Sequence, residues 1–156
     1  MCSGKSTAGR LLARRLSLPF IDLDELIRER EGLTVPQIFA LKGEPYFRAL
    51  ELKLLRRLLG RPAVVATGGG LGARPYALAL MRKAGLVIYL DAPFSDLIRR
   101  CSDQGRPLLK QSLTAVKRLY ERRRSVYLKA DLKVDARRPP EAVVREILLT
   151  LKRNAL

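Results

Sequence analysis

Histidine is absent from this 156-residue chain, which excludes a histidine-based catalytic triad and a histidine-ligated metal site. Cysteine is scarce, and Cys2 and Cys101 match the spacing of neither a metal cluster nor a disulfide framework. No apolar run approaches the roughly 20 residues of a membrane-spanning helix, and the N-terminus lacks a charged-then-apolar secretory pattern. We therefore expect one cytoplasmic domain over residues 1–156, without a membrane partner.

Acidic residues are too few to balance the basic ones, since 31 Lys and Arg face 15 Asp and Glu and leave a net charge of +16. A field of this sign attracts polyanions, among them nucleotides, phosphorylated metabolites and nucleic acids. Aromatic residues make up only 6% of the chain, so few side chains could stack on bases. The basic residues are also spread along the chain, which favours solvated helix faces over a nucleic-acid interface.

Short β-rich apolar segments alternate with longer helical patterns, and this alternation predicts βαβ units in an α/β fold with a parallel sheet. The expected strands are residues 20–22, 63–67, 86–90 and 132–134. Helices are expected over residues 6–16 and 113–128, with others opening near Thr34, Pro45, Ser95 and Pro140. Thr34 and Gln37 have capping-box spacing, and Ser95 is expected to cap a helix that runs through Arg100.

The clearest motif is Ser3-Gly4-Lys5-Ser6-Thr7, which leads directly into an amphipathic helix. It matches the closing half of the phosphate-binding loop G-x-x-x-x-G-K-[ST]. A glycine lets the backbone approach phosphate oxygens, and the amides and dipole of the helix N-terminus favour the anion. Lys5 can reach the β- and γ-phosphates and the Ser6 hydroxyl can ligate Mg²⁺, so the motif predicts ATP and Mg²⁺. The alternative is a chance Gly-Lys-Ser sequence at a helix start.

The opening half of this loop is missing, because its first glycine would stand two positions before Met1. The strand that precedes the loop is missing too, and in folds with this loop that strand lies at the centre of the sheet. An N-terminal extension of roughly ten residues would supply strand, glycine and spacer. We expect a misassigned start codon or a truncation, and favour the first.

Four further motifs follow in order. They are Asp22-Leu23-Asp24, Tyr46-Phe47-Arg48 with Glu51, Thr67-Gly68-Gly69-Gly70 and Arg106-Pro107-Leu108-Leu109. In addition, Arg123 stands four residues before Tyr127. Taken singly, the acids could be helix caps, the Arg48–Glu51 spacing a surface pair and the glycines a turn. Taken together, the motifs resemble the shikimate kinase family over essentially the whole chain. Cys2 and Ser125-Val126 depart from it, where the family has a glycine and Pro-Leu.

This resemblance implies a three-layer αβα P-loop kinase fold whose first, central strand is missing from this sequence. It also implies transfer of the ATP γ-phosphoryl to the 3-hydroxyl of shikimate, in aromatic amino-acid biosynthesis. The resemblance implies that Asp22 lies near Mg²⁺ and that Asp24 binds the shikimate hydroxyls. Two acids at positions i and i+2 of a strand end would face the same way, so one could serve the metal and the other the substrate. The carboxylate of shikimate would be held by Arg48 and Arg123, with Glu51 holding Arg48 in place.

The remaining implied roles concern the ring of shikimate, the nucleotide and a lid. Gly68, Gly69 and Gly70 would leave space for the ring and supply a backbone amide. Arg106, in a lid of about residues 102–112, would neutralise the transferring phosphoryl group together with Lys5. Adenine would contact Arg100 and Pro140, although a one-residue gap makes Arg100 the weaker match.

Three alternatives stay open on the sequence. The chain could be another small-metabolite kinase, such as a gluconate kinase, because paired arginines only require an anionic acceptor. It could be a basic nucleic-acid-binding domain with a vestigial phosphate loop. It could also be a non-catalytic homologue disabled by truncation. We expect a monomeric enzyme.

Overall fold

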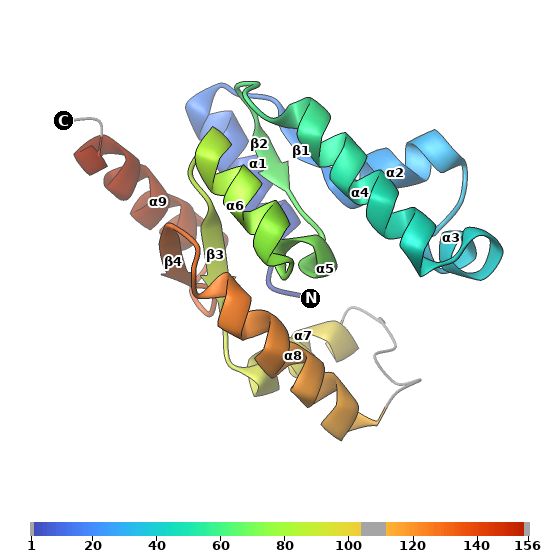
Figure 1. The fold of residues 1–156 in the computed structure, drawn as a ribbon. Helices are drawn as coiled ribbons and strands as arrows, with labels where there is room; N and C mark the ends of the chain where they lie inside the picture. Colours follow the sequence, from blue (N-terminus) through green and yellow to red (C-terminus); the bar gives the residue numbers. More distant parts are fainter. Residues whose placement is uncertain (1, 104–111, 155–156) are drawn as a thin grey trace.

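The computed structural model describes residues 2–103 and 112–154 of the chain. In this part of the chain each strand is followed by one to three helices (Figure 1). The strands are β1 (Phe20–Asp22), β2 (Val64–Ala66), β3 (Ile88–Asp91) and β4 (Leu132–Asp135). The helices are α1 (Lys5–Leu16), α2 (Leu23–Glu31), α3 (Val35–Lys42), α4 (Glu44–Leu58), α5 (Gly69–Gly72), α6 (Pro75–Ala84), α7 (Phe94–Asp103), α8 (Leu113–Tyr127) and α9 (Pro140–Asn154).

The strands form two parallel pairs. β1 pairs with β2, with Phe20 opposite Val64, and β3 pairs with β4, with Ile88 opposite Leu132. Within the described residues the two pairs share no ladder of hydrogen bonds. Each expected strand is present with ends shifted by at most two residues, and the prediction of an α/β fold with parallel strands is confirmed.

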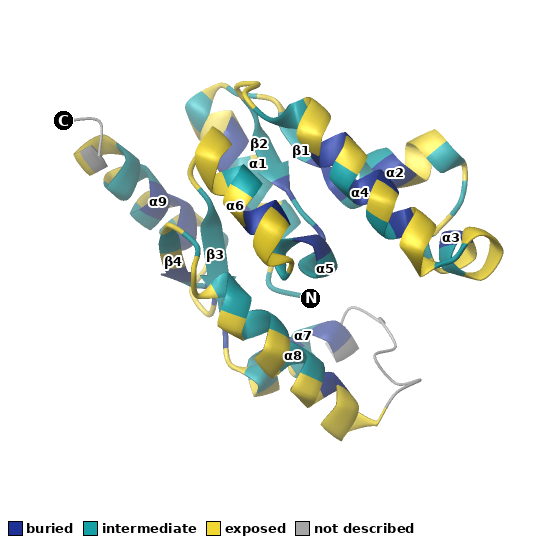
Figure 2. Ribbon diagram, viewed as in Figure 1, coloured by how far each residue is buried: buried dark blue, intermediate teal, exposed yellow. Residues whose placement is uncertain are grey.

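Buried apolar side chains form clusters among the helices, and one of the two larger clusters also includes a strand. One lies among α2, α3, α4 and α5, where the predicted apolar face of α4 (Phe47, Leu50, Leu54, Leu55) is buried and only Leu58 is partly exposed. The other lies between α1, α9 and β4 and contains Leu12, Val134 and Val143. Figure 2 shows α4 buried along one face and exposed along the other, as its helical periodicity predicts.

A cavity of about 520 Å³ lies between the two strand pairs. Its walls are largely apolar and come from both β2 and β3 and from α1, α4 and α6, including Leu12, Leu55, Val65, Leu78, Ile88 and Leu90. An apolar space flanked by two strands has the shape in which a further strand would fit. That a central strand belongs there stays a prediction.

Two local expectations about helix starts have different outcomes. The capping box before α3 is confirmed, because the Thr34 hydroxyl accepts from the Gln37 amide and the Gln37 side chain accepts from the Thr34 amide. The prediction that Ser95 caps α7 is wrong. The helix starts one residue earlier, at Phe94, and the amides of Asp96 and Leu97 donate to the carbonyl of Pro93.

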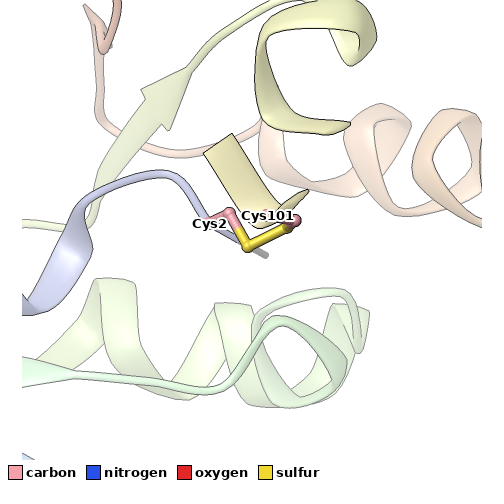
Figure 3. Close-up of a disulfide and its surroundings, with 2 residues drawn as sticks. All are labelled: Cys2 and Cys101. Carbon is pink, nitrogen blue, oxygen red and sulfur yellow. A yellow bond between two sulfur atoms is a disulfide. The ribbon is translucent and has the colours of Figure 1, made fainter. Parts of the chain in front are cut away.

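The two cysteines also differ from expectation. Cys2 and Cys101 form a disulfide, with 5.5 Å between their Cα atoms and a sequence separation of 99 (Figure 3). The sequence argument against a disulfide failed because it relied on spacing, whereas α7 brings Cys101 beside the start of the chain only in the folded structure. In the part of the chain that the structure describes, no helix is long and apolar enough to cross a membrane.

Candidate active site

The phosphate-loop motif forms the turn that enters α1. Gly4 is the residue before the helix and adopts φ of +83°, in the left-handed region that favours glycine. A Cβ built on Gly4 would meet no atom within 4 Å, so the backbone here borders open space. Ser3 precedes this turn and Thr7 lies in the first turn of the helix. The arrangement leaves helix N-terminal amides facing an accessible space, as an anion site requires.

Asp22 connects the phosphate loop to the end of β1. Its Oδ2 atom accepts a hydrogen bond from Ser6 Oγ at 2.7 Å and lies 3.7 Å from Lys5 Nζ. Burial of Asp22 raises the pKa of its carboxyl, but the Ser6 hydrogen bond, the Lys5 charge and two backbone amides together leave that pKa below its ordinary value. Asp22 is therefore an anion at neutral pH, beside a hydroxyl and an ammonium group.

The two acids of the Asp22-Leu23-Asp24 motif lie in different elements, which corrects the expectation that both occupy a strand end. Asp22 ends β1 and also caps α2, because its Oδ1 accepts from the amides of Asp24 and Glu25 at 3.1 and 3.4 Å. Asp24 is in the first turn of α2. A single carboxylate thus serves as helix cap and as neighbour of Lys5, so the two interpretations of this motif are compatible.

The glycine run lies directly against charged side chains. A Cβ on Gly68 would stand 3.0 Å from Asp24 Oδ1 and 3.2 Å from Glu51 Oε1. A Cβ on Gly70 would stand 2.6 Å from the Arg48 Cζ atom, a distance at which something must shift. Gly69 and Gly70 begin the short helix α5 rather than a turn. The run is explained by the close approach of Asp24, Glu51 and Arg48.

Arg48 is held by two carboxylates on its own helix. Its Nη1 donates to Glu51 Oε2 at 2.7 Å, and its Nη2 donates to Glu44 Oε1 at 3.1 Å. Burial lowers the pKa of Arg48, but the contacts with Glu51 and Glu44 together outweigh it and leave the pKa raised. Glu51 is 1% exposed, and this burial raises the pKa of its carboxyl. The guanidinium of Arg48 is thereby fixed in orientation over the glycine run.

Tyr127 attaches α8 to the opposite side of the glycine run. Its hydroxyl donates to the Gly69 carbonyl at 2.5 Å, and burial raises the pKa of that hydroxyl despite the nearby Arg123 guanidinium. Arg123 and Tyr127 line the cavity between β2 and β3 together with Ser3, Lys5, Gly68 and Gly69. The phosphate loop, the glycine run and the two α8 residues therefore share one cavity.

Sequence reasoning missed the contacts that hold α8 in place. Asp91, at the end of β3, accepts from Arg124 Nε and Nη2 at 3.1 and 2.9 Å, and from the Tyr89 hydroxyl at 2.8 Å. Burial raises the pKa of Asp91, but these donors lower it below the ordinary value. The available signal was an acid at the carboxyl end of a strand, where parallel α/β folds collect functional groups.

The residues expected at adenine lie on α7 and at the start of α9. Arg100 Nη2 donates to the Ala136 carbonyl at 2.7 Å, which joins α7 to the segment after β4, and Pro140 is the first residue of α9. Arg106 and nearly all of the expected lid lie outside the described residues.

The described residues suit a hard cation only in combination with phosphate. No cluster of three or more His, Cys, Asp or Glu that could hold a metal ion occurs among them. Mg²⁺ is commonly held by one or two protein oxygens, waters and the phosphates of a nucleotide. The Ser6 hydroxyl and the Asp22 carboxylate, 2.7 Å apart, are a donor set of that kind.

Comparison with known proteins agrees with this geometry. A family model described as shikimate kinase matches residues 1–152. The shikimate kinase of Aquifex aeolicus strain VF5 is 52% identical over all of this chain and 94% of its own length. A crystal structure of shikimate kinase from Aquifex aeolicus covers the same shares with a TM-score of 0.92.

A second solved structure, shikimate kinase from Acinetobacter baumannii in complex with shikimate, is 30% identical. Its TM-score is 0.88, over all of this chain and 90% of its own. A gluconokinase from Sinorhizobium meliloti, at 20% identity and a TM-score of 0.55, shares the fold alone. The family model matches nearly the whole sequence, and one relative is 52% identical over all of it. The chain therefore belongs to the shikimate kinase family, a family of ATP-dependent kinases.

Proposed function

We propose that this chain transfers the γ-phosphoryl group of ATP to the 3-hydroxyl of shikimate, in the cytoplasm and as a monomer with one domain. The product, shikimate 3-phosphate, serves aromatic amino-acid biosynthesis. The single observation that carries the proposal is the close approach of Asp24 to Gly68 and of Arg48 to Gly70, with Gly68 and Lys5 lining one cavity. A carboxylate and a fixed guanidinium near a phosphate loop support phosphorylation of a hydroxy acid.

On the nucleotide side, the proposal assigns the β- and γ-phosphates to the amides of residues 3–7 and to Lys5. Lys5 Nζ lies 3.7 Å from the Asp22 carboxylate and would neutralise charge on the transferring group. Ser6 would hold Mg²⁺ as a ligand, with Asp22 in its outer shell, and the ion would supply positive charge that reduces phosphate repulsion of the incoming hydroxyl. Arg100 and Pro140 would contact adenine.

On the acceptor side, Arg48 and Arg123 would bind the shikimate carboxylate, and the ring would lie against Gly68, Gly69 and Gly70. Asp24 would accept a hydrogen bond from the 3-hydroxyl and take its proton as the phosphoryl group is transferred. Because Glu51 and Glu44 already orient Arg48, little side-chain entropy is lost on binding. Catalysis of this kind consists mostly of positioning and charge stabilisation, for which no histidine is needed.

The test of substrate class is a titration of each arginine variant with shikimate and with ATP. Arg48→Ala and Arg123→Ala should each weaken shikimate binding about tenfold or more, because a charge-assisted contact contributes about 1.5–3 kcal/mol. ATP affinity should change little. Arg57→Ala is the matched control, because Arg57 is exposed and on the same helix as Arg48.

Unchanged shikimate affinity in both variants would contradict the substrate assignment. A panel of acceptors that includes gluconate, read by ADP release, separates this enzyme from other small-metabolite kinases and from an inactive homologue. Salt-dependent binding of mixed oligonucleotides without ATP binding would instead favour the nucleic-acid alternative.

Arg106→Ala should lower turnover by orders of magnitude and leave ATP affinity within a few-fold of the parent value. The reason is that a contact made in the transition state affects kcat.

A further inference from the structure

The disulfide joins the start of the phosphate-loop segment to helix α7. Cys2 is half-buried and stands two residues before Gly4, whereas Cys101 is 1% exposed and belongs to α7 (Figure 3). The neighbouring Arg100 of α7 donates to the Ala136 carbonyl. One covalent bond therefore links the residues proposed to bind phosphate to the residue proposed to contact adenine.

The backbone at Cys2 is also constrained. Its φ of +46° is in the left-handed region, and Cys2 and Ser17 are the non-glycine residues there among those that the structure describes. A residue with a Cβ disfavours this conformation unless its surroundings impose it. The bond to the buried Cys101 is the constraint that can impose it, and it thereby fixes the chain that enters the Ser3-Gly4-Lys5 turn.

We propose that the Cys2–Cys101 pair is a thiol–disulfide modification site that sets the affinity of the phosphate loop for ATP. The inference rests on the proposed function and adds a determinant of nucleotide binding to it. With the bond formed, the loop is held in the conformation that binds phosphate, and little ordering remains to be done on binding. With the bond reduced, Cys2 leaves the left-handed region, and the loop must be ordered anew by each nucleotide.

The chemistry is a dithiol exchange. A thiolate of a reducing dithiol attacks Cys2 Sγ, the more accessible sulfur, and Cys101 leaves as a thiolate. The second thiol of the reductant attacks the mixed disulfide, and Cys2 leaves. Two electrons and two protons pass to the enzyme, which ends with two thiols, and the reductant ends as a disulfide. A small-molecule disulfide reverses these steps.

The experiment compares ATP titration calorimetry of the whole protein in two forms, with free thiols counted in each. The oxidised form should bind ATP about threefold to thirtyfold more tightly than the form reduced with dithiothreitol. Shikimate affinity should be the same in both forms, because its proposed contacts lie on α2, α4, α5 and α8. The Cys2→Ser/Cys101→Ser double variant should match the reduced form and show no response to dithiothreitol.

The possible results of this experiment distinguish failure of the inference from failure of the proposed function. Equal ATP affinity in the oxidised and reduced forms would overturn the inference and leave the proposed function intact. Loss of both ATP and shikimate binding on reduction would also overturn it, since the bond would then hold the fold and not the loop. A response to dithiothreitol in the double variant would assign the effect to another cause. Absence of ATP binding in both forms would contradict the proposed function itself.

Discussion

At the scale of single residues, the glycine run is explained by side chains and not by backbone freedom. Gly68 and Gly70 are not among the glycines with positive φ, so an alanine could adopt their backbone conformation. What excludes a Cβ is the charged groups that lie against them, Asp24 and Glu51 at Gly68 and the Arg48 guanidinium at Gly70. These two positions should therefore report on substrate binding more than on folding.

Gly70→Ala is the sharpest test at this scale. The new Cβ would stand 2.6 Å from Arg48 Cζ, and the guanidinium could move only by breaking its 2.7 Å contact with the buried Glu51. We expect shikimate affinity to fall about tenfold or more, the value of a lost charge-assisted contact. ATP affinity should stay within a few-fold. Titration calorimetry with each ligand measures both.

The matched control for this change is Gly85→Ala. A Cβ on Gly85 meets no atom within 4 Å, and its φ of 177° is open to any residue. Its shikimate affinity should equal that of the parent protein. If Gly70→Ala and Gly85→Ala bind shikimate equally well, Arg48 can move without loss of shikimate affinity. Its fixed position would then be unimportant for binding.

At the scale of helices and strands, the sequence predicted what periodicity and local chemistry decide. The buried face of α4 follows from the spacing of Phe47, Leu50 and Leu54, and the start of α3 follows from the Thr34–Gln37 pair. Ser95 failed as a cap because the Pro93 carbonyl starts α7 without a side chain. Asp24 was placed wrongly because α2 begins directly after β1.

Contacts between segments distant in sequence could not be predicted from the sequence. The Cys2–Cys101 bond spans 99 residues, and the Asp91–Arg124 pair joins a strand end to a helix 33 residues later. Neither follows from spacing, because packing of whole elements decides which side chains meet. The candidate site residues, and Glu51 as the partner of Arg48, were proposed by motif resemblance, whereas Asp91 and Arg124, which hold α8, were not.

Asp91→Asn tests whether this strand end positions α8. Arg124 would lose a two-point ion pair, and α8, which carries Arg123 and Tyr127, would be attached less firmly. Arg124 is partly exposed, so we expect a loss of about 1 kcal/mol, which lowers Tm by about 2–4 °C in a chain of this size. Shikimate affinity should fall by about twofold to tenfold, as measured by calorimetry.

Asp131→Asn is the matched control, because it also removes an acid that pairs with an arginine. Asp131 accepts from Arg82 and from the Val87 amide, before β4 and β3 begin, at the end opposite Asp91. Its loss should lower Tm and leave shikimate affinity unchanged. If the two variants lose shikimate affinity equally, the effect of Asp91 is general destabilisation and not positioning.

At the scale of the whole molecule, the two strand pairs face each other across the cavity of about 520 Å³. β2 and β3 each present one paired and one unpaired edge within the described residues. Unpaired backbone at a sheet edge costs free energy when buried and invites association when open. The walls are largely apolar, and Ser3 and Lys5 also line the cavity. A strand that leads into the phosphate loop would end directly before these two residues.

We predict that an apolar strand added before Met1 fills this cavity. The extension would hold about five or six Val, Ile or Leu residues followed by glycine and one spacer, which restores the spacing of the phosphate loop. It would pair with both β2 and β3 and bury apolar surface, so Tm should rise by about 10 °C or more. ATP affinity should rise too, because the restored loop supplies further amides to the phosphates.

The control is an extension of equal length in which Ser and Gly replace the apolar residues. It adds the same number of residues and the same loop glycine but cannot fill an apolar space favourably, so its Tm should equal that of the chain beginning at Met1. Thermal melts and ATP titrations of the three proteins decide the matter. If the apolar extension leaves Tm and ATP affinity unchanged, the cavity between β2 and β3 is not a strand site. The two pairs would then be stable as separate sheets, held together by the helices and by the Cys2–Cys101 bond.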